Sequence, residues 1–151
     1  MHSEVQDYYG KTLKGTEDLQ TNACCTADQP SSELKSILSK LHDEVMSRYY
    51  GCGLIAPDNL DGCHILDLGS GSGRDCYVLS AMVGEKGTVT GVDMTAEQLE
   101  VANRHIEYHA EKFGYNQPNV RFIEGYLEKL DELDLESNHF DVIVSNCVLN
   151  L

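Results

Sequence analysis

Small residues and an acid surround a turn that could bind a nucleoside. Gly69, Gly71 and Gly73 alternate with serines between an apolar run and a helical pattern. Backbone N–H groups at such a strand-to-helix turn are free to bind the polar groups of a ligand. Asp93 lies about 20 residues further on, where a carboxylate can accept hydrogen bonds from both hydroxyls of a ribose. We therefore expect a nucleoside at this turn.

The spacing of the glycines argues against a dinucleotide. A dinucleotide-binding turn has the pattern G-x-G-x-x-G, and Arg74 occupies the position of its last glycine in this chain. Similar glycine patterns also occur in tight turns that bind nothing. The expected nucleoside site thus depends on the combination of strand, glycine turn, helix, second strand and acid.

Cysteine is the other residue type that could do chemistry. The sequence has six cysteines and begins without the segments of a signal peptide, so we expect free thiols rather than disulfides. Cys63 and Cys76 fall in apolar patterns and are expected to be buried core residues. The other four could act as soft ligands of a thiophilic metal or metalloid, and they are Cys24, Cys25, Cys52 and Cys147.

Composition and charge narrow the class of protein. With 151 residues and ordinary shares of apolar and charged residues, the chain suits one globular domain. Its net charge of -14 would repel a phosphate backbone, which excludes nucleic-acid substrates. No stretch approaches the ~20 apolar residues of a membrane span, so no membrane partner is expected. We expect a cytoplasmic protein.

The apolar pattern alternates between strand and helix periods. Helices are expected over 34–49, 74–83, 95–113 and 127–133, and strands over 63–68, 88–92, 120–124 and 140–145. Ser31 and Ser32 offer a helix cap, and Thr95 with Gln98 forms the pattern of a capping box. This alternation predicts an α/β fold: a partial Rossmann-like sheet of about four parallel strands with helices on both faces.

Two parts of the chain are expected to differ in structure. Residues 1–32 form a cysteine-bearing arm with a short helix, and residues 33–151 form the nucleoside-binding domain. Leu151 follows the fourth expected strand by only a few residues, where a doubly wound sheet normally continues. We therefore expect this chain to be the amino-terminal portion of a longer domain.

The nucleoside motif resembles that of class I S-adenosylmethionine (SAM)-dependent methyltransferases. Residues 67–73 read D-x-G-x-G-x-G, and the flanking strands, the helix and Asp93 complete a resemblance that covers residues 50–151. It implies that the glycine turn approaches the methionine part of SAM. It also implies that Asp67 lies near the amino group of SAM and that Asp93 holds the ribose.

The same resemblance implies a set of cofactor-binding residues. Where other members place an acid against the adenine, this chain has Gly125, Tyr126 and Leu127, so backbone groups and the apolar faces of Met94 and Leu127 are expected to hold the ring. The residues expected to contact SAM are Tyr50, Asp67, Gly69, Ser70, Gly71, Gly73, Asp93, Met94, Thr95, Gln98, Tyr126, Leu127, Asn146 and Val148.

Longer motifs resemble arsenite methyltransferases over nearly the whole chain. They include Tyr49-Tyr50-Gly51-Cys52-Gly53, Gly73-Arg74-Asp75-Cys76-Tyr77 and Ser145-Asn146-Cys147-Val148. The resemblance implies that cysteine thiolates bind trivalent arsenic, As(III), and that SAM supplies a methyl group to it. Arsenite or methylarsenite would then be the substrate.

Three cysteines match the family's catalytic positions, namely Cys24, Cys52 and Cys147, and Cys25 is a neighbour of the first. The resemblance implies that Cys52 and Cys147 ligate As(III), with a further ligand cysteine missing downstream. It also implies that Cys24 takes part in reduction by a thiol reductant such as glutathione or a thioredoxin-like protein. Because the arsenic lone pair attacks the methyl carbon directly, no general base is required.

Two alternatives remain open. Since the family continues beyond Leu151, the chain could be a non-catalytic module that binds SAM and thiophiles. It could also methylate a small organic acceptor, with Cys147 serving only as pocket wall. Methylation of arsenite distinguishes an enzyme from the module, and arsenite titration with thiol counting distinguishes a metalloid site from an organic one.

Overall fold

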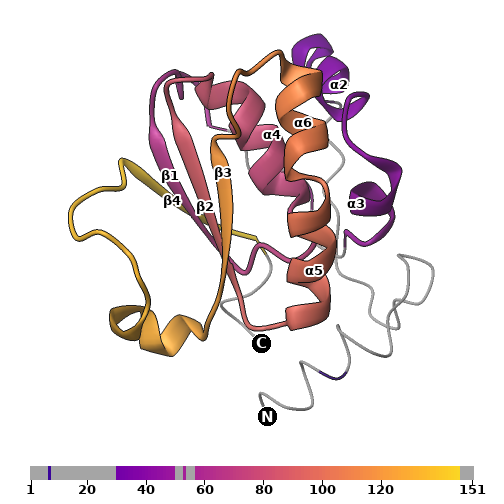
Figure 1. The fold of residues 1–151 in the computed structure, drawn as a ribbon. Coiled ribbons are helices and arrows are strands. Elements are labelled where there is room, and N and C mark those ends of the chain that lie inside the picture. Colours follow the sequence, from indigo (N-terminus) through magenta and orange to yellow (C-terminus); the bar gives the residue numbers. More distant parts are fainter. Residues whose placement is uncertain (1–6, 8–29, 50–52, 54–56, 147–151) are drawn as a thin grey trace.

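Four parallel strands form the sheet at the centre of the protein (Figure 1). The computed structural model describes residues 7, 30–49, 53 and 57–146. The strands are β1 (His64–Leu68), β2 (Thr88–Asp93), β3 (Val120–Glu124) and β4 (Val142–Ser145), in the order β3-β2-β1-β4. Every neighbouring pair is parallel. The predicted four-stranded parallel sheet is therefore confirmed.

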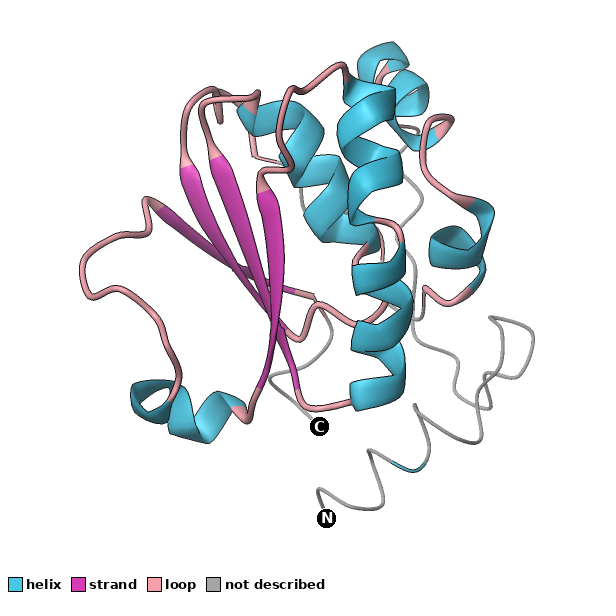
Figure 2. Ribbon diagram, viewed as in Figure 1, coloured by secondary structure: helices cyan, strands magenta, loops and turns pink. Residues whose placement is uncertain are grey.

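The strand order reverses next to β1. The chain passes from β1 through β2 to β3 at one edge and then returns to β4 on the other side of β1. Because such connections are right-handed, the first two must cover one face and the third the other face. Figure 2 shows α4 (Arg74–Val83), α5 (Ala96–Arg104) and α6 (Ile106–Phe113) on one face, and the connection with the 3₁₀ helix η3 (Leu127–Glu132) on the other. Ligands of such sheets bind where the connections diverge, here at the carboxyl ends of β1 and β4.

Apolar side chains on the helix-covered face form the core. Ile65, Val89 and Val120 are neighbours across three strands and are all buried. They pack against α4, which contributes the fully buried Cys76. Cys63 lies half-buried against the same core. The prediction of a buried core cysteine is thus confirmed for Cys76, whereas Cys63 packs against the core without being fully buried.

The opposite face is covered less completely. Leu66 and Val92 are buried there, whereas Ile143 of the edge strand β4 is 62% exposed. Arg121 of β3 reaches across to the carbonyl of Asp134 in the β3–β4 connection (3.5 Å). Within residues 57–146, this connection and not an α-helix covers that face. No helix in the described part of the chain is long and apolar enough to span a membrane.

Two short helices precede the sheet, α2 (Ser32–Leu38) and α3 (Asp43–Ser47). Ser31 caps α2 through its side chain, in agreement with the prediction. The single helix expected over 34–49 is wrong, because the chain leaves the helix after α2 and begins another at α3. The interruption places His42 before α3, where its Nδ1 accepts the Glu44 N–H (3.1 Å).

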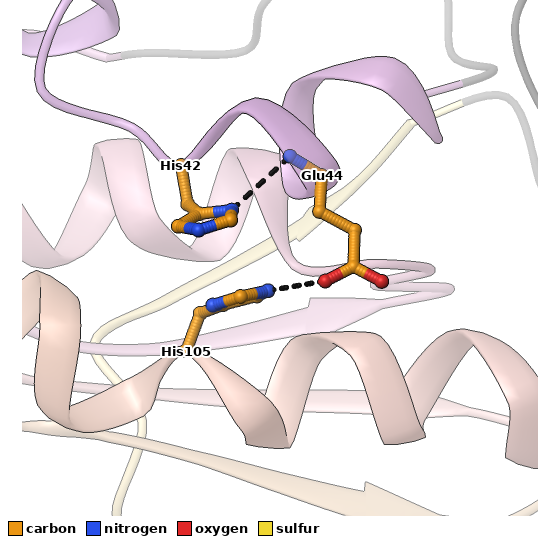
Figure 3. Close-up of side chains that lie close together, drawn as sticks. All are labelled: His42, Glu44 and His105. Atoms are coloured by element: carbon orange, nitrogen blue, oxygen red, sulfur yellow. Dashed lines mark hydrogen bonds and ion pairs between the residues drawn. The ribbon is translucent and has the colours of Figure 1, made fainter.

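Histidines dock α3 onto the junction of α5 and α6 (Figure 3). The backbone N–H of His42 donates to Nε2 of His109 (3.2 Å), and the His42 ring stacks on that of His105 with 3.7 Å between centroids. Glu44 bonds to Nε2 of His105 (2.6 Å) and to Arg104 (2.7 Å). The His105 hydrogen bond and the Arg104 charge lower the pKa of Glu44. These long-range contacts interrupt the helical pattern.

The helix expected over 95–113 also differs in detail. It is divided at His105, whose φ of -111° marks the junction of α5 and α6. The predicted capping box is wrong, because the Thr95 side chain makes no cap hydrogen bond. Its side chain and its N–H contact the carboxylate of Asp93 instead. A long-range contact of His105 with Glu44 therefore marks the end of α5, and a local contact with Asp93 marks its beginning.

His109 makes the free energy of unfolding depend on pH. Its Nδ1–H donates to the His105 carbonyl (2.7 Å), its ring stacks on Tyr77 (3.6 Å), and burial lowers its pKa from 6.5 to about 4. The unfolded chain therefore binds a proton between these values while the native protein does not. We expect acidification from pH 6.5 to 4 to cost up to about 3 kcal/mol through this group. In urea titrations His109→Gln should lose this component, and an unchanged pH profile in the variant would contradict the assignment.

Candidate cofactor and acceptor site

The glycine turn after β1 is held tightly against β2. The N–H groups of Gly69 and Ser70 both donate to the carbonyl of Val92 (2.7 and 3.0 Å). A Cβ on Gly91 of β2 would lie 2.8 Å from the Ser70 side chain, so only glycine lets the turn approach this strand. The sequence analysis missed Gly91; its signal is a glycine inside an otherwise β-branched strand.

Gly73 and Gly71 of the same turn are glycines for two other structural reasons. Gly73 has a φ of +89°, and a Cβ there would lie 2.7 Å from the ring of Phe122. It therefore permits the close packing of α4 on β3. Gly71 has a φ of +53° and open space around the position of a Cβ, which leaves its backbone accessible to a ligand.

Asp93 connects the glycine turn to the beginning of α5. Its Oδ2 accepts the Gly71 N–H and its Oδ1 accepts the Thr95 N–H, both at 2.8 Å. Burial raises the pKa of Asp93, although the hydrogen bonds from Gly71 and Thr95 oppose this. The Thr95 side chain and the Met94 N–H also hydrogen-bond to this carboxylate, so the glycine turn, the end of β2 and the start of α5 meet at one acid.

Asp67 is a nearly inaccessible carboxylate at the end of β1. It is 2% exposed, and its Oδ2 accepts a hydrogen bond from Sγ of Cys76 (3.1 Å). Burial raises its pKa to about 7, the Cys76 hydrogen bond opposes this, and the charges of Asp75 and Asp93 add to it. Three carboxylates around one turn repel each other and would favour a cationic ligand. The Cys76 donor is a second feature that the sequence analysis missed.

Several expected contact residues gather at the same edge of the sheet. Ser70 is 8% exposed, and its Oγ has no hydrogen-bond partner among the described residues. Gln98 is 2% exposed on α5. The Gly125 N–H donates to the carbonyl of Asp93 (3.0 Å), which brings the Tyr126 corner to the end of β2. Buried polar side chains beside the partly exposed residues at Tyr126 suit a ligand that has polar and aromatic parts.

A second group of side chains lies at the end of β4. Nδ2 of Asn146 contacts Oδ2 of Asp75 (2.8 Å), the Gly53 carbonyl (3.1 Å) and the Tyr49 hydroxyl (2.6 Å). Arg74 donates to the Gly53 carbonyl (3.2 Å) and to Oδ1 of Asp75 (3.1 Å). We call these five residues the Asp75 cluster. It joins Tyr49 and Gly53, which precede β1, to α4 and to the end of β4, a connection that sequence spacing does not indicate.

The described structure brings twelve of the expected cofactor-binding residues to the carboxyl edge or to the helices beginning there, and their role as ligands stays a prediction. They are Asp67, Gly69, Ser70, Gly71, Gly73, Asp93, Met94, Thr95, Gln98, Tyr126, Leu127 and Asn146. The other predicted site residues lie outside the described residues, and they are Cys24, Cys25, Tyr50, Cys52, Cys147 and Val148.

One group in the described part of the chain offers three potential metal-ligand atoms within 4.8 Å, from His42, Glu44 and His105 (Figure 3). The two rings are stacked with only 20° between their planes. Because ring lone pairs lie in the ring plane, they run nearly parallel and cannot meet on one ion at about 2 Å. His42 Nδ1 is also engaged by the Glu44 N–H. We interpret this group as the docking contact of α3.

Comparison with known proteins decides the family. The model of the methyltransferase domain family matches residues 59–151. The chain belongs to this family. Its similarity to arsenite methyltransferases extends over all of its residues, at 62% identity for the protein of Aquipseudomonas alcaligenes and 55% for that of Homo sapiens. The chain covers 43% and 40% of these two relatives, so it spans about two fifths of their length.

A solved structure supports the same relationship. The crystal structure of CrArsM, an arsenic (III) S-adenosylmethionine methyltransferase from Chlamydomonas reinhardtii, superposes with a TM-score of 0.78. The two are 48% identical, and the match covers 82% of this chain and 41% of CrArsM. The resemblance predicted from the cysteine and glycine motifs is confirmed, and so is the methyltransferase fold.

Removal of the Asp67 charge should stabilise this methyltransferase domain. The native pKa of about 7 exceeds the ordinary value of 3.8, so native stability falls as the pH rises between them. Asp67→Asn keeps the shape and an acceptor for Cys76. At pH 8 we expect its free energy of unfolding to exceed that of the wild type by up to roughly 4 kcal/mol, with little difference at pH 4. The exposed Asp131→Asn is the control, and equal stability of wild type and Asp67→Asn at pH 8 would refute the assignment.

Proposed function

We propose that this chain binds SAM at the carboxyl ends of β1 and β2 and takes part in methyl transfer to As(III) held by cysteine thiolates. The observation that carries the acceptor assignment is the 3.1 Å hydrogen bond between Asn146 and Gly53. These residues are the sequence neighbours of Cys147 and Cys52. The similarity of the whole chain to proteins named arsenite methyltransferase supports the choice of arsenic.

The residues at the carboxyl edge fit SAM in charge and in hydrogen bonding. SAM carries a sulfonium and an ammonium cation, which suit a turn surrounded by buried carboxylates. Asp67 would hold the ammonium group, Asp93 the ribose hydroxyls, and the unpartnered Ser70 Oγ can donate to an oxygen of the ligand. Met94 and Leu127 would pack on the adenine. When bound, SAM supplies an electrophilic methyl group.

The remaining expected contacts surround this core of the site. Thr95 and Gln98 begin α5 beside Asp93, and both side chains are buried. Tyr126 is 38% exposed at the corner after β3 and can cover a ring. Tyr50, Asn146 and Val148 complete the proposed set, and Asn146 would limit the pocket on the side of β4.

The thiols provide the acceptor chemistry. Thiolate is a soft ligand, and thiophilic metalloids bind it in preference to oxygen ligands. We assign Cys52 and Cys147 as the As(III) ligands and Cys24 to the exchange with a thiol reductant, such as glutathione or a thioredoxin-like protein. The arsenic lone pair forms the new bond to carbon while the sulfonium carbon–sulfur bond breaks, so this chain needs to align the atoms but not to remove a proton. A cytoplasmic location agrees with free thiols.

Substitution of the proposed arsenic ligand tests the function directly. Cys147→Ser should abolish methylation of arsenite because serine is a poor ligand for As(III), while the affinity for SAM changes by less than about threefold. The assay combines the protein, arsenite, a dithiol and labelled SAM, and calorimetry gives the SAM affinity. Cys63→Ser is a matched control at a cysteine beside the core.

Different outcomes separate the candidate functions. Unchanged arsenite methylation by Cys147→Ser would disprove the ligand assignment. Arsenite binding by the wild type without any methyl transfer would support a binding module instead. If the protein methylates an organic acceptor and arsenite does not reduce the number of titratable thiols, the result would favour a small-molecule methyltransferase.

A further inference from the structure

We propose that Cys76 is a positioning residue for Asp67: its thiol holds one oxygen of the carboxylate in place and leaves the other for the ammonium group of SAM. The inference rests on the proposed function, in which Asp67 binds that group. Cys76 itself is 0% exposed, so it cannot touch a ligand and acts only through the acid.

The backbone brings the thiol to the carboxylate. Asp67 and Ile65 are two residues apart in β1, so their side chains lie on the same face of the sheet, where Ile65 packs in the core with α4. Cys76 is the third residue of α4, and its Sγ donates a hydrogen bond to Oδ2 of Asp67 (3.1 Å). In the described part of the chain, no group donates to Oδ1 of Asp67. The second oxygen therefore remains for a ligand.

Burial makes this hydrogen bond important for the acid. A carboxylate that is only 2% exposed depends on donors from the protein, because little water can reach it. An apolar side chain in place of Cys76 could fill the core equally well, but it would leave Oδ2 without a donor. A thiol is a weak donor, so it favours the anion less than a hydroxyl group would. Cys76 thus combines core packing with a modest preference for the charged acid.

The titratable groups that face Asp67 come from two elements. Besides Cys76, α4 brings Asp75, which is paired with Arg74, and β2 ends at Asp93. Burial raises the pKa of Asp67, the thiol of Cys76 lowers it, and the charges of Asp75 and Asp93 raise it further. The other strand beside β1 is β4, which contains no titratable residue. Of these groups, Cys76 is therefore the one that favours the anion.

The thiol keeps its proton while the acid titrates. Burial raises the pKa of Cys76 well above its ordinary value, and the charge of Asp67 raises it further. Within this pair only Asp67 changes its charge near neutral pH, so Cys76 remains a donor throughout. Removal of the donor should shift Asp67 toward its neutral form, which attracts a cation less strongly.

The pH dependence of SAM affinity tests the proposal. Calorimetry on the whole chain gives the midpoint pH at which binding strengthens. In Cys76→Ala we expect this midpoint to rise by about one pH unit, which is the size of one hydrogen bond to a charged group. The ratio of the affinities at pH 8 and pH 6 should then grow from about tenfold to about fiftyfold. Cys76→Ser keeps a donor, so its midpoint should stay at or below that of the wild type.

A control and a second measurement separate hydrogen bonding from packing. Ser80→Ala is the matched control on the same helix, because it also removes a buried donor, but one that bonds to Asn119 (2.6 Å). Its midpoint should equal that of the wild type. NMR titration of the aspartate carboxyl carbons follows Asp67 in the ligand-free protein, and the loss of its signal in Asp67→Asn identifies it. The Asp67 titration should move with the same sign in each variant.

Each outcome decides the matter. An unchanged midpoint in Cys76→Ala would overturn the proposal, and so would an equal rise in Cys76→Ala and Cys76→Ser, which indicates a packing effect. If Cys76→Ala does not fold, Cys76→Ser decides, since a midpoint above that of the wild type contradicts the role of the donor. Failure of the wild type to bind SAM would disprove the proposed function, and this inference with it. Normal SAM binding with an unmoved Asp67 titration in the variants would disprove the inference alone.

Discussion

The carboxylate of Asp93 accepts one hydrogen bond from the glycine turn and another from the first turn of α5. These two bonds fix the turn after β1 relative to β2. The glycines, the capping of α5 and the close approach of Gly91 are all consequences of bringing this acid and this turn together.

This arrangement places three carboxylates with little exposure to solvent around one turn. Asp67 and Asp75 are nearly inaccessible, Asp93 is partly buried, and burial raises the pKa of all three. Arg74 is the cation that pairs with one of them, at Asp75. Among the side chains that the structure describes, the thiol of Cys76 is the hydrogen-bond donor to Asp67. A protein selected for stability alone would replace this acid, whereas a protein that binds a cationic nucleoside derivative uses it.

Local patterns predicted the strands, α4 and the glycine turn because their periodicity and flanking glycines depend on few residues. The helix breaks at His42 and His105 could not be predicted, since each results from contacts between histidines and Glu44 across distant segments. The capping box failed for a local reason, because Asp93, two residues before Thr95, binds the Thr95 N–H and side chain. The Asp75 cluster joins three segments, and a single sequence carries no signal for such a meeting. The cysteine motifs indicated the relationship to arsenite methyltransferases without indicating any geometry.

Calorimetric titration of the chain with SAM at pH 6 and at pH 8 tests the central claim most directly. If Asp67, with its pKa of about 7, holds the ammonium group, SAM should bind up to about tenfold more tightly at pH 8 than at pH 6. Binding of equal strength at both pH values, or no heat of binding at either, would contradict the account.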